Sequence, residues 1–287
     1  MSRIAIALMW LLHWLPFRAI GMAGALLGHL LYQVNSERRH TTLTNLRLCF
    51  PDLSSAEITA LAQRHFVAFA QSALERGVLW WASPDRLHKL IATRGDEHLR
   101  ALDGRRVILV APHFVGLDAG WTRLTMEHDM ATMYAHVKNI AFDNALRHGR
   151  ERFGQQQLLS RQAGLRDAIA AIRNGNPFYY LPDMDYGAKD ALFVSFFGIE
   201  AATITTLARL ARITDARVAT VVTRRHRDGY VVSISAPWEN FPSDNLETDT
   251  KRMNSMIEAE VMAGDVAQYF WSHKRFKSRP PGEKGVY

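Results

Sequence analysis

A histidine and an aspartate follow a short apolar segment at a spacing that suits acid–base chemistry. His113 and Asp118 come after residues 106–111 (RVILVA), which are typical of a buried strand. On one regular helix, a separation of five residues would place the two side chains about 140° apart, so they would not meet. If His113 lies in a strand-to-helix turn and Asp118 in the first helical turn, the carboxylate can accept a hydrogen bond from the imidazole. The second ring nitrogen would then be free to act as a base.

The same two residues also have a purely structural interpretation. In that interpretation His113 caps a turn, and Asp118 is an acid favoured by the dipole at a helix N-terminus. A catalytic pair of this kind would have no nucleophile of its own, because the chain contains no Gly-x-Ser-x-Gly sequence and its single Cys49 lies in a distant helical segment. The attacking group would therefore be a hydroxyl or an amine of the substrate.

Strands and helices alternate along most of the chain. We expect strands at residues 106–111, 130–134, 178–181, 192–197, 218–223 and 230–235, and helices at residues 54–80, 117–128, 139–152, 162–173, 203–213 and 249–263. Ser54 and Glu57 form a capping box at the start of the first of these helices. The alternation predicts an α/β fold whose sheet is covered on both faces, with functional residues at the carboxyl ends of the strands.

Composition limits the class of protein. The 287 residues include 35 Lys and Arg against 28 Asp and Glu, which gives a net charge of +7, and 48% of the residues are hydrophobic. This hydrophobic content excludes a disordered chain. The single cysteine excludes an intramolecular disulfide and a multi-cysteine zinc site, and it fits a reducing compartment. The basic charge is compatible with an anionic membrane surface, an acidic protein or nucleic acid.

Residues 4–33 are mostly apolar but are interrupted by His13, Pro16 and Arg18. At ~1.5 Å per helical residue this segment is long enough to span a bilayer core of about 30 Å. Because Arg18 and Pro16 lie near its middle, two short helices that enter one leaflet are an equally good interpretation. A cleaved signal peptide is a third and weaker one, because the apolar segment continues past the only suitable cleavage point.

Several longer blocks of sequence carry a resemblance to a known family. The string HFVGLD at residues 113–118 has the His-x4-Asp pattern of glycerolipid and lipid A acyltransferases. The chain resembles the lipid A biosynthesis acyltransferase family of Gram-negative bacteria in the blocks at residues 45–54, 148–154, 158–187, 193–211 and 268–282. This resemblance implies a glycerolipid-acyltransferase-like α/β fold with a single central mixed sheet flanked by helices. It also implies a catalytic domain at residues 35–287 that follows a membrane-associating helical segment at residues 1–34.

The resemblance implies that a fatty acyl chain moves from an acyl carrier protein thioester to a hydroxyl of a lipid A precursor or related glycolipid. No cofactor is implied, because the acyl carrier protein brings the donor as a co-substrate. The implied location is the cytoplasmic face of the bacterial inner membrane, with the N-terminal helix as the anchor and no role for nucleic acid. A lysophospholipid or aminolipid acyltransferase and a non-catalytic lipid-binding relative remain as alternatives.

The resemblance also implies which residues carry out the reaction. His113 would be the general base, and Asp118, which stands where many members have Glu, would orient it. Arg150 matches the family's functional arginine and would bind a lipid A phosphate or the developing oxyanion. Asp183 matches the first acid of the family's Pro-Asp-x-Asp-Tyr-Gly block. Transfer would be direct, without an acyl-enzyme.

Further residues are candidates for binding substrate, namely Tyr134, Arg152, Arg161, Asp185, Lys274 and Arg275. The basic run at residues 273–279 suits an acidic carrier protein or anionic lipid, and no nucleic-acid-binding motif accompanies it. Asp183 and Asp185 have no histidine at ligand spacing, so we expect them to stabilise a loop or the site arginine rather than bind a metal. Apolar residues of the expected helix at residues 54–80 and the strand at residues 193–197 would line an acyl pocket or pack in the core.

Overall fold

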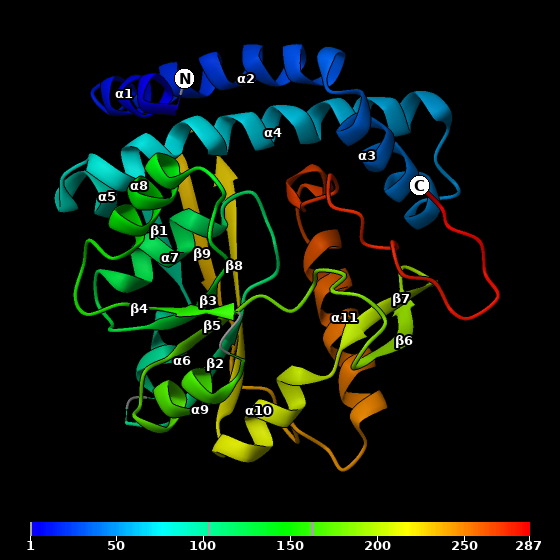
Figure 1. Cartoon of the computed structure of the whole chain (residues 1–287). Helices are drawn as coiled ribbons and strands as arrows, with labels where there is room; N and C mark the ends of the chain where they lie inside the picture. Colours follow the sequence, from blue (N-terminus) through cyan, green and yellow to red (C-terminus); the bar gives the residue numbers. More distant parts are fainter. Residues whose placement is uncertain (1, 103, 162–163) are drawn as a thin grey trace.

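The computed structural model describes residues 2–102, 104–161 and 164–287 (Figure 1). The helices are α1 (Ser2–Leu12), α2 (Phe17–Val34), α3 (Ser36–Cys49), α4 (Ser55–Trp81), α5 (Pro84–Leu90), α6 (Asp96–Arg100), α7 (Leu117–Thr125), α8 (Ile140–Arg150), α9 (Arg166–Arg173), α10 (Thr206–Thr214) and α11 (Leu246–Met262). The strands are β1 (Ile91–Arg94), β2 (Val107–Val110), β3 (Ala131–Tyr134), β4 (Gln157–Ser160), β5 (Phe178–Tyr180), β6 (Ala191–Phe196), β7 (Ile199–Ile204), β8 (Arg217–His226) and β9 (Gly229–Ile234).

Seven of these strands form the central sheet, in the order β1-β9-β8-β2-β5-β3-β4. Neighbouring strands are parallel except for β8 and β9, which are antiparallel, so the sheet is mixed. This confirms the expected α/β fold with a central mixed sheet flanked by helices. The strand expected at residues 192–197 belongs instead to a separate antiparallel hairpin, in which β6 pairs with β7.

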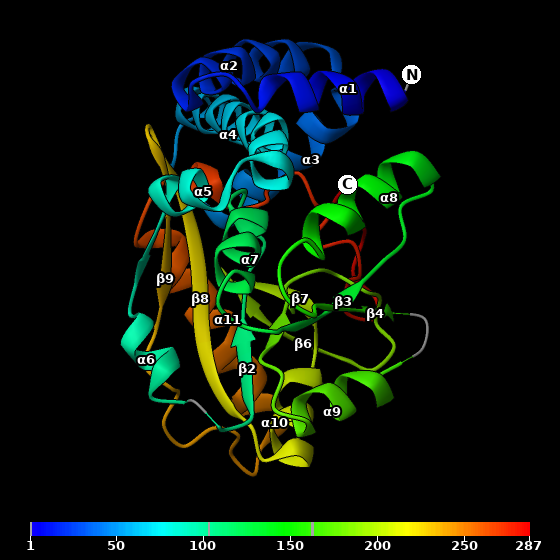
Figure 2. The ribbon, with the colours of Figure 1, turned by 90° about the vertical axis from the view of Figure 1, so that its left-hand side faces the viewer.

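Both faces of the sheet are covered, because the apolar side chains of β2 alternate between two cores. Ile108 and Val110 pack in one core with residues of α9, α10 and α11, whereas Val107 and Leu109 pack in the other with residues of α7. Helix α4 crosses above the sheet and contributes residues to both cores (Figures 1 and 2). The two cores hold the carboxyl ends of the central strands beneath α4.

Helix α4 begins at the capping box that the sequence predicts. The Ser54 hydroxyl accepts from the Glu57 amide at 3.3 Å, and the Glu57 carboxylate accepts from the Ser54 amide at 2.8 Å. Two of the unpaired amides at the start of this helix are thereby satisfied. The helix then runs for 27 residues and fixes the direction from which its side chains reach the sheet.

The N-terminal segment forms two helices, α1 and α2, which are separated at Pro16. Helix α2 lies along α4 (Figure 1) and approaches it closely at two glycines. A Cβ atom at Gly24 would lie 2.6 Å from the Gln71 Cα, and one at Gly28 would lie 2.5 Å from the Val67 Cα. The glycine spacing therefore serves packing within the chain. No helix in the described ranges is both long and apolar enough to cross a bilayer, so the expectation of a single spanning helix is not supported.

Short strands account for most of the differences from the expected elements. The helix expected at residues 203–213 begins only at Thr206, because residues 199–204 form β7. Strands β1 and β4 have four residues each and were not expected. The start of the helix expected at residues 162–173 includes residues 162 and 163, which lie outside the described residues, and α9 begins at Arg166.

Candidate active site

A cavity of about 730 Å³ lies at the carboxyl ends of the central strands β2, β3 and β5, beside α4, α7 and α8. Its volume is within the range of sites that bind small molecules. The cavity is lined by residues that include Phe69, Arg76, His113, Leu117, Asp118, Met133, Tyr134, Leu146, Arg150, Arg161, Tyr180, Met184, Tyr186, Lys189, Thr206 and Phe270. The alternation of strands and helices predicts functional residues at the carboxyl ends of the strands, and the cavity lies there.

His113 is held by Asp183 at this edge of the sheet. Strands β2 and β5 are parallel neighbours, with Val110 paired to Tyr180, and the two functional residues each lie three positions after that pair. The His113 Nδ1 lies 2.6 Å from Asp183 Oδ1, and the His113 amide donates to Asp183 Oδ2 at 2.8 Å. The carboxylate thus fixes the imidazole with Nδ1–H as donor, and Nε2 is left as the acceptor. Among the described residues, Nε2 has no hydrogen-bond partner.

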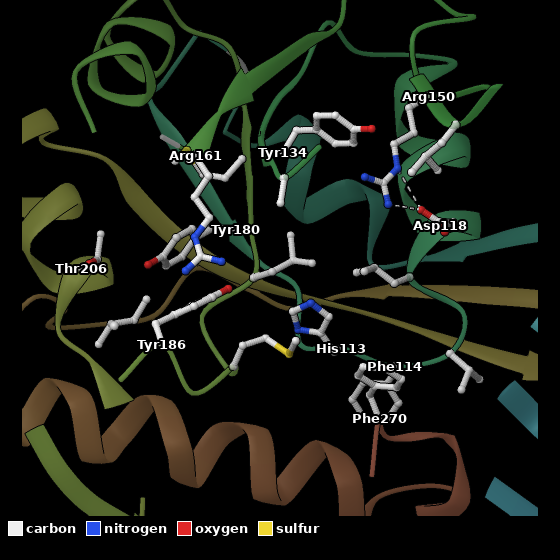
Figure 3. Close-up of a pocket in the computed structure, with 18 of the residues that line it drawn as sticks. His113, Phe114, Asp118, Tyr134, Arg150, Arg161, Tyr180, Tyr186, Thr206 and Phe270 are labelled. Atoms are coloured by element: carbon white, nitrogen blue, oxygen red, sulfur yellow. Dashed lines mark hydrogen bonds and ion pairs between the residues drawn. The ribbon is translucent and has the colours of Figure 1, made fainter. Parts of the chain in front are cut away.

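The expected contact between His113 and Asp118 is wrong. Asp118 lies in the first turn of α7, as predicted, but its carboxylate accepts hydrogen bonds from Arg76 and Arg150 instead (Figure 3). The physical reason is strand pairing, because the register of β2 with β5 brings Asp183 within hydrogen-bond distance of His113. A carboxylate does hold the histidine, as the sequence predicts, but it comes from another strand.

Two guanidinium groups hold Asp118 at the cavity wall. Arg150 donates through Nε at 3.1 Å and Nη2 at 2.5 Å to Oδ1, and Arg76 donates through Nε at 2.7 Å to Oδ2. Arg150 is the last residue of α8, and its carbonyl accepts from the Trp121 indole at 3.0 Å, which fixes that end of the helix. Burial alone would raise the pKa of Asp118, but the two arginines outweigh it and hold this pKa well below its usual range. The cluster carries a net charge of +1.

The C-terminal segment holds the turn that carries His113. The Phe270 amide donates to the His113 carbonyl at 2.9 Å, and the Val115 amide donates to the Gln268 carbonyl at 2.8 Å. The Phe270 ring stacks beside the imidazole, with 6.3 Å between the ring centroids. Phe270 also stacks on Phe69 of α4, with 5.8 Å between the ring centroids. The histidine is therefore fixed by its backbone, its carboxylate partner and one face of its ring.

Other predicted residues also line the cavity. Tyr134 lies at the end of β3, and its hydroxyl is hydrogen-bonded to Asp143 of α8. The Arg161 guanidinium lies over the ring of Tyr186, 3.7 Å from its centroid. Tyr134 and Arg161 thus reach the same cavity as His113, from different strands of the sheet.

Four residues predicted to bind substrate have structural partners outside this cavity. Arg152 donates to the Leu79 and Ala82 carbonyls at 2.8 and 2.7 Å, which closes the end of α4. Asp185 accepts from the amide and hydroxyl of Ser278 at 2.7 and 2.9 Å.

The other two belong to the basic run at residues 273–279. Arg275 is 4% exposed and donates to the Ala202 carbonyl and the Thr203 hydroxyl, both at 2.8 Å. Lys274 is half-buried and pairs with Glu37 at 3.1 Å. Sequence alone suggests a binding role for all four residues because it shows their charge but not the partners within the fold that satisfy it.

Several cavity residues were not predicted, namely Arg76, Tyr180, Tyr186, Thr206 and Phe270. Arg76 and the buried Glu75 are adjacent charged residues within an otherwise apolar part of α4, which is a signal that the sequence does contain. The expected acyl pocket agrees only in part with the structure. Phe69 lines the cavity, whereas Phe66, Leu79 and Trp80 are core residues and β6 contributes none of the lining.

The arrangement suits proton transfer at a polarised carbonyl. His113 presents one ring nitrogen to the cavity, and Arg76 and Arg150 place positive charge at its wall. Cys49 is buried in α3, and burial raises the pKa of its thiol, so it stays protonated. The reacting nucleophile is therefore not this cysteine.

Comparisons with known proteins give a matching family and several similar proteins. Residues 2–278 match the family model of the bacterial lipid A biosynthesis acyltransferases. The chain is 32% identical to the lipid A biosynthesis lauroyltransferase of Escherichia coli K12, over 99% of this chain and 94% of that protein. It is 30% identical to the lipid A biosynthesis myristoyltransferase of the same organism, over 92% of this chain and 82% of that protein.

Among solved structures, a 1-acyl-sn-glycerophosphate acyltransferase from Thermotoga maritima is similar with a TM-score of 0.40 and 15% identity. That match covers 85% of this chain and 96% of the other. The family match extends over nearly the whole chain and includes every residue of the cavity described above. The chain therefore belongs to the bacterial lipid A biosynthesis acyltransferase family, and it is an acyltransferase of lipid A biosynthesis.

Proposed function

We propose that this protein transfers a fatty acyl chain from an acyl carrier protein thioester to a hydroxyl of a lipid A precursor, with His113 as the general base. The observation that carries the proposal is the His113–Asp183 pair, in which a carboxylate that is 1% exposed holds the imidazole and leaves Nε2 facing the cavity. Burial alone would raise the pKa of Asp183, but its contacts with His113 outweigh this and lower the pKa. Asp183 thus stays ionised and orients the base.

The proposed transfer is direct. The acceptor hydroxyl gives its proton to His113 Nε2 as its oxygen attacks the thioester carbonyl carbon. The tetrahedral intermediate then collapses with cleavage of the carbon–sulfur bond, and protonated His113 returns the proton to the departing thiolate. The products are an ester and a free thiol, and no bond forms to the protein.

Arg150 and Arg76 support the proposal as the positive groups of the site. Both line the cavity, and their side chains remain 21% and 30% exposed although both are bonded to Asp118. Guanidinium groups held in a fixed position stabilise an oxyanion or a phosphate without reorganisation in the transition state. Asp118 acts here as the group that positions the two arginines, and not as the partner of the base.

The exposed apolar surface of α1 and α2 supports association with a membrane surface on the cytoplasmic side of the inner membrane. Ten of the seventeen large hydrophobic residues that are exposed in the described part of the chain lie between residues 4 and 34. They are Ile4, Leu8, Trp10, Leu11, Trp14, Leu15, Met22, Leu26, Leu30 and Val34. Helices that bury one apolar face in a leaflet have this pattern, so we propose a surface-bound rather than a spanning attachment.

The test is transfer of a labelled acyl group from acyl carrier protein to a tetraacylated lipid A precursor by the purified protein in detergent. We expect transfer by the wild type and its near-complete loss in His113→Ala. His88→Ala is the matched control, because His88 is exposed on α5 and lies outside the cavity. Circular dichroism would verify that both variants fold.

Two results would contradict the proposal. Transfer only to a lysophospholipid or an aminolipid would reassign the acceptor, and a covalent acyl adduct on the protein during turnover would exclude direct transfer.

A separate experiment tests attachment to the membrane surface. Leu11→Glu with Leu26→Glu should abolish flotation with anionic vesicles, whereas Ile213→Glu on α10 should not. Flotation that survives the paired change would overturn the surface attachment.

A further inference from the structure

One part of the cavity has a different chemistry from the rest. Arg161, Tyr180, Tyr186 and Thr206 line it together, and we call this part the polar arm. In Figure 3 these four residues gather on one side of His113, and Asp118 and Arg150 lie on the other side. The mechanism described above uses none of the four residues.

The polar arm contains a cation without a carboxylate partner. The Arg161 guanidinium stacks on the Tyr186 ring at 3.7 Å and makes no ion pair within the residues that the structure describes. Lys189 and Asp190, which follow Tyr186 closely in the chain, also line the cavity, so the three charges sum to +1. A guanidinium that stacks on an aromatic ring keeps its N–H edge available for an anion.

The second observation is the hydroxyl of Tyr180. This residue is 5% exposed, its ring lines the cavity, and its hydroxyl lies by that of Thr206 without a hydrogen bond of normal geometry in the described part of the chain. Burial raises the pKa of Tyr180, so the group stays a neutral donor. Buried polar groups in folded proteins nearly always have a partner, and an unmet one is costly. A ligand with an acceptor oxygen would satisfy it.

The third observation is the start of α10. Thr206 is the first residue of this nine-residue helix, it lines the cavity, and no side chain caps the first turn. The free amides and the dipole at a helix N-terminus favour a phosphate. Figure 3 shows Thr206 next to Tyr180 and Arg161, so three different elements present donors to one place.

We propose that the polar arm binds the phosphate of the phosphopantetheine group that carries the donor acyl chain. In this arrangement Arg161, the Tyr180 hydroxyl and the first turn of α10 hold the phosphate, and the pantetheine chain leads from there to the thioester beside His113. The inference rests on the proposed carrier-protein donor and assigns the part of the cavity that receives it.

The arrangement of the molecule favours the donor over the acceptor as the source of this phosphate. Helix α10 lies on the side of the protein opposite to α1 and α2 (Figure 1). These two helices and the turn between them carry ten of the seventeen exposed large hydrophobic residues of the described chain. A lipid acceptor would arrive from the apolar side, where Arg76 on α4 and Arg150 on α8 lie. A water-soluble carrier would arrive from the side of α10, so its prosthetic group enters the polar arm first.

The test compares three donors that bear the same acyl chain: the acyl carrier protein thioester, the acyl-phosphopantetheine thioester and the acyl-pantetheine thioester, which lacks the phosphate. For the wild type we expect kcat/KM with acyl-phosphopantetheine to exceed kcat/KM with acyl-pantetheine by about tenfold to a hundredfold. This is the usual contribution of hydrogen bonds to a charged group. In Arg161→Ala this ratio should fall close to one, and Arg161→Lys should restore part of it. Arg166→Ala is the control, because Arg166 is exposed on α9 and outside the cavity.

The outcomes separate this inference from the proposed function. A wild-type ratio near one, or a ratio that Arg161→Ala leaves unchanged, overturns the phosphate site while transfer itself stands. A change confined to the KM of the acceptor assigns Arg161 to the lipid A phosphate and also overturns the inference. Failure of the wild type with all three donors overturns the proposed function instead. Tyr180→Phe and Thr206→Val should lower the same ratio by smaller factors.

Discussion

Two aspartates near His113 have opposite partners. Asp183 follows β5 and accepts from the imidazole of His113, whereas Asp118 begins α7 and accepts from two guanidinium groups. Both are nearly buried, and their partners hold both pKa values below the usual range. The first carboxylate orients a base, and the second fixes two cations. The comparison teaches that the acid nearest to a histidine in sequence need not be the acid that serves it.

The largest expected effect comes from breaking the His113–Asp183 pair. We expect His113→Ala to lower kcat by about 10² to 10⁴, the usual contribution of a general base. Since Asp183 acts through His113, adding Asp183→Asn to His113→Ala should cost little more, because groups that act as a unit are non-additive. Adding Asp118→Asn should lower kcat further. Steady-state rates of the single and double variants measure this, and full additivity of the Asp183 change would contradict the pairing.

The second effect concerns stability at the Asp118 cluster. Because the folded-state pKa of Asp118 is lowered, its stabilisation is complete above the unfolded pKa of about 3.9 and is lost as the pH falls through the folded value. We expect Asp118→Asn to lower the free energy of unfolding by about 3 kcal/mol at pH 7. The difference in the free energy of unfolding between this variant and the wild type should shrink as the pH falls below about 4.

Urea unfolding at pH 7, 5 and 3.5 measures this difference. Asp228→Asn is the matched control, because Asp228 forms an exposed pair with Arg18 and its loss should leave the midpoint unchanged. A gap between wild type and Asp118→Asn that stays constant with pH would show that the ionised carboxylate is not the source of the stability.

A smaller effect separates the two arginines that Asp118 holds. Arg150 donates twice to the carboxylate and lies beside Tyr134, whereas Arg76 donates once and is more exposed. Arg150→Ala should lower kcat/KM by about tenfold to a hundredfold, and Arg76→Ala by a smaller factor. Transfer kinetics with varied acceptor concentration measure both. Equal losses would indicate that the two guanidinium groups act as one site.

The smallest effect is expected outside the cavity. Lys274 pairs with Glu37 at the surface, at 3.1 Å, so Lys274→Ala should change the free energy of unfolding by less than about 1 kcal/mol. It should also leave the KM for the lipid acceptor unchanged. A thermal melt and a transfer assay check the two statements, and a rise in KM would restore the sequence-based assignment of Lys274 to substrate binding.

The parts of the fold that depend on local pattern were predictable. The capping box at Ser54 and the apolar run that becomes β2 need only neighbouring residues, and both are where the sequence predicts them. Strands β1, β4 and β7 were missed because short strands are defined by the strand beside them. Residues 203 and 204 were expected to begin a helix, but they belong to β7, and pairing with β6 decided their conformation.

The candidate site was predictable in its residues but not in its contacts. His113, Asp118, Tyr134, Arg150 and Arg161 all line the cavity, as their sequence context indicated. Arg152, Asp185 and Arg275 bind backbone or hydroxyl groups elsewhere, because charged groups that are buried or half-buried are satisfied wherever the fold offers partners.

The sequence by itself determined the family, the class of reaction and the position of the functional residues at strand ends, because motifs and alternation are local properties of the chain. The tertiary structure alone decided which residues meet. His113 and Asp183 are 70 residues apart, Arg76 and Asp118 are 42 apart, and Asp118 and Arg150 are 32 apart. Such contacts depend on strand order and helix packing, which form only when the whole chain buries its apolar surface.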